Sequence, residues 1–143
     1  MALVVKVGSE FLVNTQTAGA QQMPSIAHLA GGGFVVTWQD ASGTLGDTDG
    51  TSIKAQIYGA GGVKVGGEFL VNSSTAGNQG SPTVAGVADG GFVVTWADQG
   101  NRNIKVQAFG SDGVGAGKRC LHGDRSQSKS TSKRLVANAN YAI

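Results

Sequence analysis

The sequence predicts an all-β protein built from repeated four-stranded antiparallel meanders. Residues 5–14 return as residues 63–72 with one change in ten positions, and the segment Phe-Val-Val-Thr-Trp at 34–38 returns unchanged at 92–96. Both matches have an offset of 58 residues. Glycine is abundant, with 24 residues in 143, and no stretch has the apolar period of an amphipathic helix. A recurring unit of this length is typical of repeat arrays and propellers.

Each unit divides into short strands that are separated by glycine-rich turns. The expected strands, in order along the chain, are residues 10–14, 24–30, 34–38, 53–58 and 68–72, followed by 82–88, 92–96 and 104–109. The turns between the first two strands of each full unit are Gly-Gly-Gly at 31–33 and Asp-Gly-Gly at 89–91. Asp-Gly between apolar runs is a strong hairpin signal.

The strands of a unit differ in their side chains, and this difference predicts their places in the sheet. Residues 34–38 carry no strongly polar face, so we expect this strand to be covered on both sides. Residues 24–30 and 82–88 are rich in small side chains, which suit a crowded inner strand. Residues 53–58 alternate between polar and apolar side chains, as an outer and partly wet strand does. We therefore expect the strands of a sheet to lie side by side in chain order, from the inner strand at 24–30 to the strand at 68–72.

About nine residues, 15–23 and 73–81, connect one meander to the next. They reach about 30 Å when extended, which exceeds the width of about 14 Å of a four-stranded blade. This length favours a crossing from the outer edge of one blade to the centre of the next, the plan of a β-propeller. A two-sheet β-sandwich is the alternative.

The repeats cover residues 1–117, with units at about 5–62 and 63–113, and residues 118–143 form a divergent or truncated third repeat with a basic tail. Two blades cannot close a ring of four to eight, and exposed apolar edge strands pair readily with other chains. We therefore expect a homo-oligomer, in which the N-terminal strand of one chain completes a blade of its neighbour.

Charge and composition exclude several classes of function. Residues 1–117 carry eight acidic and five basic side chains, and residues 118–143 carry six basic side chains and one acid. The repeated body is thus mildly acidic, and we expect no nucleic-acid partner. The single cysteine, Cys120, excludes an internal disulfide framework. No apolar run is long enough to span a membrane. An export signal is expected outside this chain, because residues 1–7 are too short for one.

Motifs of catalysis are missing from the sequence, so an enzyme is the less favoured class. One version of an enzyme remains open, a hydrolase whose channel site uses aspartates and His28. A packed or solvated histidine is the simpler interpretation of His28.

Two tryptophans with nearby carboxylates form a candidate ligand site. Trp38 lies two residues before Asp40, and Trp96 lies two residues before Asp98. An aromatic ring beside a carboxylate acceptor is a frequent arrangement in sugar sites, so glycans are candidate partners. The alternative is that both rings wedge between blades.

The insertion at residues 41–50 contains a candidate metal site. Asp47 and Asp49 precede Gly50, and Asp40 adds a third carboxylate. Oxygen-rich loops of this kind hold calcium, although the full acidic pattern of an EF-hand loop is missing. An ordinary Asp-Gly turn without any cofactor is the alternative.

The repeat motifs resemble a known class of sequence. Gly-Gly-Phe-Val-Val-Thr-Trp, then Ile-Lys-x-Gln-x-Phe/Tyr, Asp-Gly and Val-Gly-x-Glu-Phe-Leu-Val-Asn are similar to tandem repeats of about 50 residues in very large bacterial secreted or surface proteins, often beside hemolysin-type calcium-binding regions. The resemblance covers residues 5–117. It implies export to the cell surface or medium, repetitive β structure and a role in adhesion or structural display. The chain departs from that setting because it lacks the Gly-Gly-x-Gly-x-Asp calcium nonapeptides. A lectin-like propeller and the channel hydrolase are the rival functions.

Overall fold

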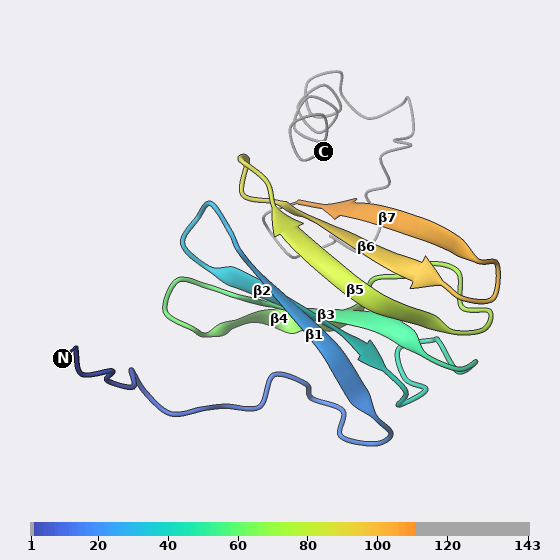
Figure 1. The fold of residues 1–143 in the computed structure, drawn as a ribbon, viewed down its shortest axis with the longest axis horizontal. Helices are drawn as coiled ribbons and strands as arrows, with labels where there is room; N and C mark the ends of the chain where they lie inside the picture. Colours follow the sequence, from blue (N-terminus) through green and yellow to red (C-terminus); the bar gives the residue numbers. More distant parts are fainter. Residues whose placement is uncertain (1, 111–143) are drawn as a thin grey trace.

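The computed structural model describes residues 2–110, which form seven β-strands and no helix (Figure 1). The strands are β1 (Gln21–His28), β2 (Phe34–Asp40), β3 (Ser52–Tyr58), β4 (Lys64–Leu70), β5 (Gln79–Gly86), β6 (Phe92–Asp98) and β7 (Asn103–Phe109). The all-β prediction is confirmed. The third repeat and the basic tail expected at 118–143 lie outside the described residues. Residues 2–110 include no helix with the length and hydropathy needed to cross a membrane.

The strands form two antiparallel sheets, and the first has the predicted meander. Its order is β1-β2-β3-β4, and the order of the second is β5-β6-β7. The connection after β4 runs from one edge of the first sheet to β5, which lies against β1 and β2 and contacts β3 less (Figure 1). The crossing expected between meanders is therefore present.

The two sheets repeat each other in their hydrogen-bonded register. Phe34 pairs with Tyr58 in the first sheet, as Phe92 pairs with Phe109 in the second. The first strand of each sheet is interrupted by an irregularity, between Gln22 and Ser25 in β1 and between Gly80 and Thr83 in β5. Met23 and Ser81, which are 58 residues apart, have positive φ angles of 53° and 54° at these positions. A β-bulge of this kind re-aims a strand and increases its twist, so both sheets bend at the same place.

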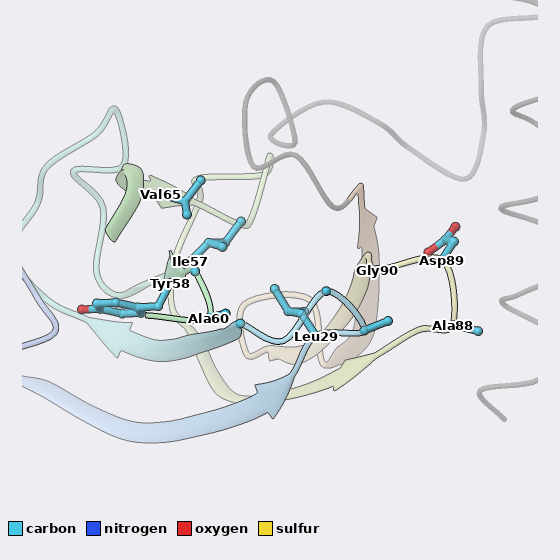
Figure 2. A pocket seen from close by; sticks show the side chains of 12 residues that line it. Leu29, Ile57, Tyr58, Ala60, Val65, Ala88, Asp89 and Gly90 are labelled. Atoms are coloured by element: carbon cyan, nitrogen blue, oxygen red, sulfur yellow. The ribbon is translucent and has the colours of Figure 1, made fainter. Parts of the chain in front are cut away.

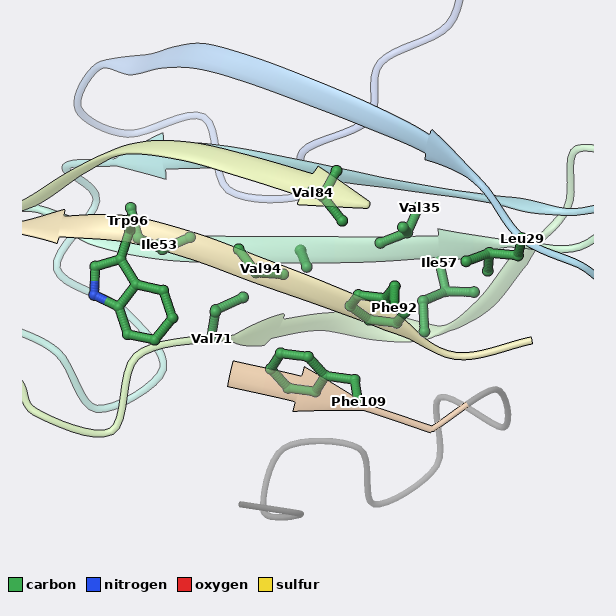
Figure 3. Packing of buried hydrophobic residues seen from close by; sticks show 11 residues of the cluster. Leu29, Val35, Ile53, Ile57, Val71, Val84, Phe92, Val94, Trp96 and Phe109 are labelled. Atoms are coloured by element: carbon green, nitrogen blue, oxygen red, sulfur yellow. The ribbon is translucent and has the colours of Figure 1, made fainter. Parts of the chain in front are cut away.

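The main core lies between the two sheets (Figure 3). One side comes from β2 and β3, with Val35, Ile53 and Ile57, and the other comes from the second sheet. The residues of the second sheet in this core are Val84, Phe92, Val94, Trp96 and Phe109. Each such side chain contributes about 1.5–3 kcal/mol when fully buried. The core thus joins one repeat to the next.

A smaller cluster covers the other face of the first sheet. Val36, Trp38 and Tyr58 are buried there, and Val13 and Phe34 pack against them. Strand β2 is buried from Val35 to Asp40, so the prediction that it is covered on both sides is confirmed. Strand β6 instead alternates between buried and half-buried residues.

Two sequence predictions about strands are wrong. Residues 10–14 form no strand, and they pair with neither of the two sheets. The strand at 53–58 is not partly wet, because all of β3 is buried. Strand β4 covers the outer edge of β3, and Lys54 and Gln56 have polar partners inside the protein.

The sheets approach each other closely at β1 and β5, the first strand of each sheet. A Cβ atom at Gly86 of β5 would overlap the carbonyl oxygen of His28 at the end of β1. Farther from this line, large side chains separate the sheets, and the rings of Phe69 and Phe109 lie 5.5 Å apart between β4 and β7. The two sheets therefore converge at β1 and β5 and diverge toward β4 and β7.

Candidate functional site

The most polar buried site surrounds Lys54 of β3, and we call it the Lys54 cluster (Asp40, Ser42, Thr44, Lys54 and Glu68). The Lys54 ammonium lies 3.0 Å from an Asp40 oxygen and 3.5 Å from a Glu68 oxygen. It donates to the hydroxyls of Ser42 at 2.8 Å and Thr44 at 2.6 Å. The Lys54 side chain is 0% exposed. The cluster therefore ties the loop after β2 to the centre of the sheet.

The ionisation of Asp40 follows from these contacts. Burial raises the pKa of this carboxyl, but hydrogen bonds from the side chain and backbone of Ser42 and the pairing with Lys54 lower it more, so that the net pKa is below its usual value. A group that stays ionised at neutral pH is a poor general acid. The cluster is thus suited to a structural role, since its charged groups are paired with one another.

The second repeat contains a smaller version of the same pair. The Lys105 ammonium lies 2.7 Å from an Asp98 oxygen, and the Asn101 amide donates to that carboxylate at 3.0 Å. The hydrogen bond from Lys105 is the largest cause that lowers the pKa of Asp98 to about 2, and Asn101 adds to it. Lys105 is 33% exposed, in contrast to Lys54.

The four residues of the predicted ligand site are all buried. Trp38 is 3% exposed and Trp96 is 5% exposed, and Trp96 lies inside the core between the sheets (Figure 3). The Trp38 indole nitrogen donates to Asp40 at 3.4 Å. Asp40 and Asp98 face their lysines. Trp96 lies between the two sheets, whereas Trp38 packs on the opposite face of the first sheet, and neither ring is open for stacking on a sugar.

The three predicted metal ligands are not gathered around one point. Asp40 belongs to the Lys54 cluster, whereas Asp47 accepts from the Asn72 amide at 2.7 Å and Asp49 accepts from the Gly77 backbone at 2.9 Å. Within residues 2–110, no group of three or more His, Cys, Asp or Glu side chains is placed to hold a metal ion. Calcium binding stays a prediction.

A hydrogen-bonded clamp in the crossing loop is repeated, and the sequence interpretation missed it. The Asn72 amide donates to the Ser74 carbonyl at 2.9 Å and to the Gln79 side chain at 3.1 Å. In the preceding unit, the Asn14 amide donates to the Gln16 carbonyl at 2.7 Å and to the Gln21 side chain at 3.3 Å. The signal was available, because both Asn and Gln recur at the offset of 58 residues.

Each sheet also carries the same group of three aromatic rings. In the second sheet, Phe92 stacks on Phe109 with ring centroids 5.0 Å apart, and Phe69 of β4 contacts Phe109 at 5.5 Å. In the first sheet, Phe34 stacks on Tyr58 at 4.8 Å, and Phe11 contacts Tyr58 at 5.5 Å. These distances and their interplanar angles agree closely, so residue 11 occupies the place on the first sheet that residue 69 occupies on the second.

An open pocket lies where the hairpin turns of the two sheets meet (Figure 2). Its volume is about 460 Å³, and Leu29, Ile57, Ala60 and backbone of the turns line it. The one carboxylate in its lining, Asp89, accepts from the Gly91 backbone at 3.0 Å. His28 is exposed and is not among the lining residues. With one carboxylate and mostly apolar walls, the lining offers no nucleophile paired with a base.

Comparisons of this chain with protein-family models, with curated proteins and with solved structures found no match.

Proposed function

We propose that the chain is a non-enzymatic repeat module of a bacterial secreted or surface protein, and that it serves in adhesion or structural display. The single observation that carries this proposal is the repeated junction. The aromatic contact and the Asn–Gln clamp that link the first sheet to the second recur, at equivalent positions, between residues 11–14 and the first sheet. A chain that repeats the contact between one sheet and the next at equivalent positions is organised to extend a surface.

The arrangement of the sheets supports propeller-like blades as the form of this module. Neighbouring blades of a propeller converge at their inner strands and fan apart at their outer ones, as the pair β1 and β5 and the pair β4 and β7 do here. The β-sandwich remains the alternative, because two sheets packed face to face satisfy both plans.

The buried residues favour a structural role over the two rival functions. The tryptophans and aspartates of the lectin-like hypothesis are enclosed, and their charges are paired with Lys54 and Lys105. His28 lies outside the pocket in which a channel hydrolase would need a base. The resemblance to repeats of exported bacterial proteins adds weight to adhesion or display.

Surface display tests the proposal. We would anchor the full chain on a non-adherent bacterial strain and measure how many cells are retained under flow on glass, on glycan-coated and on protein-coated surfaces. The matched control is the same anchor carrying an unrelated β-sandwich of equal size. We expect several-fold greater retention on at least one surface. Retention equal to that of the control on every surface would contradict the proposed function.

A further inference from the structure

The outer edge of the second sheet, at β7, differs from the equivalent edge of the first sheet. In the first sheet, β4 pairs with β3. Among residues 2–110, the equivalent edge of β7 has no strand beside it. One face of β7 is open as well, because Ile104 is 78% exposed and Val106 is 52% exposed, whereas their equivalents Ile53 and Ala55 in β3 are 0% exposed in the core between the two sheets. Exposed apolar edge strands invite the addition of another strand.

The sequence of the strand that fits this edge is present once more in the chain. Residues 5–14 repeat residues 63–72, which contain all of β4, with one change in ten positions. They form no strand in the structure, and Val5, Val7 and Leu12 are exposed. After β7, the sequence Lys-Arg-Cys-Leu-His at 118–122 stands where Gly-Glu-Phe-Leu-Val is expected, so the chain does not repeat β4 there.

We propose that residues 5–14 of one copy add to β7 of a second copy as its fourth strand. The pairing of β3 with β4 fixes the register. Because Lys54 pairs with Leu70 and Ile57 pairs with Val65, the repeat offsets place Leu12 opposite Lys105 and Val7 opposite Ala108 of the second copy. The main-chain hydrogen bonds of β-strand addition supply affinity, and the alternating side chains set the register.

The aromatic contacts already position residues 5–14, which we call the donor segment. Phe69 lies in β4 of the first sheet while its ring contacts Phe109 of the next sheet. Phe11 makes the same contact with Tyr58. A donor segment can therefore join the second sheet of another copy while Phe11 stays on Tyr58 of its own chain, so the existing contact does not have to break.

Charge complementarity supports the same register. Lys54 pairs with Asp40 and lies 3.5 Å from Glu68 of β4. Its equivalent Lys105 is one third exposed and pairs with Asp98. Glu10 is the repeat equivalent of Glu68, and strand addition brings it beside Lys105. The contact is head to tail, and such contacts generate closed rings or open filaments.

A disulfide formed between two different variants tests the register directly. Both variants carry Cys120→Ser; one also carries Val7→Cys and the other Ala108→Cys. Neither can form an intramolecular disulfide. We would mix them, oxidise them gently and measure the mixed disulfide dimer by non-reducing electrophoresis and mass spectrometry. The register control replaces Val7→Cys by Leu3→Cys. Leu3 is also exposed, and it lies about 13 Å farther along an extended strand, beyond the reach of a disulfide.

We expect at least tenfold more mixed dimer from the matched pair than from the control pair. An excess of a synthetic peptide with the sequence of residues 5–14 should reduce that yield several-fold, because it occupies β7. Equal yields from both pairs, or no mixed dimer from variants whose circular dichroism shows intact β structure, would overturn the proposal. Neither outcome depends on which surface the module adheres to, so the proposed function is tested separately.

Discussion

At the scale of single residues, the two repeats place the same ion pair in different surroundings. Lys54 is fully buried between Asp40 and Glu68, whereas Lys105 keeps Asp98 and remains one third exposed. The removal of one partner from a buried pair leaves an uncompensated charge, which is far more costly than the loss of an exposed pair. The repeats thus supply an internal comparison of the two cases.

Lys54→Met should therefore destabilise the protein much more than Lys105→Met. We expect a loss of about 3 kcal/mol or more in the free energy of unfolding for Lys54→Met, because Asp40 and Glu68 lose their counter-charge. For Lys105→Met we expect about 1 kcal/mol. Urea unfolding of both variants measures the difference. Equal losses would show that the Lys54 cluster does not have the structural role assigned to it.

Acid should weaken the fold through Asp98. Its pKa is about 2 in the folded protein, compared with an ordinary value of 3.8, so the unfolded chain binds the proton more tightly. The stabilisation from this carboxylate is present above about pH 5 and is lost as the pH falls from about 4 toward 2. Urea unfolding between pH 7 and 3 should show this decline. Asp98→Asn should have a shallower decline over the same range, and an unchanged pH dependence would contradict the assignment.

At the scale of elements, the close approach of β1 and β5 depends on one glycine. Gly86→Ala places a methyl group against the carbonyl oxygen of His28, and neither backbone can yield without separating β1 from β5. We expect a loss of about 2 kcal/mol. Gly31→Ala is the matched control, because a Cβ atom there meets nothing within 4 Å. The midpoint of urea unfolding measures both, and equal midpoints would show that the sheets do not converge as described.

Strand positions were largely predictable because turns and repeats mark them in the sequence. The predicted strand 34–38 became β2 at Phe34–Asp40, and the predicted strand 53–58 became β3 at Ser52–Tyr58. The failure at residues 10–14 has a physical cause, since a strand requires a partner and pattern alone does not tell whether one is present. The burial of β3 was not predicted for a related reason. Lys54 and Gln56 are polar, and a polar residue is expected to face solvent unless its buried partners are known.

The candidate site was less predictable, because it depends on contacts between segments far apart in sequence. Asp40, Asp47 and Asp49 are close in the chain, but the fold gives each a different partner. The Asn72 clamp could have been found, because the repeat preserves Asn14 and Gln21 at the same spacing. Comparison of the two repeats position by position is thus more informative here than a search for single motifs.

At the scale of the whole molecule, the two sheets differ in how far they are covered within residues 2–110. The first sheet buries one face against the second, and the second exposes the equivalent face at Ile104 and Val106. A repeat array of this kind gains stability with each added interface. In the proposed association, β7 is the acceptor edge and residues 5–14 are the donor segment.

The mass of the protein in solution, measured by static light scattering across micromolar concentrations, tests this claim most directly. The account predicts species that are multiples of the chain mass of 14.4 kDa, whose proportion rises with concentration and falls when residues 2–14 are deleted. A folded protein of 14.4 kDa at every concentration would contradict it.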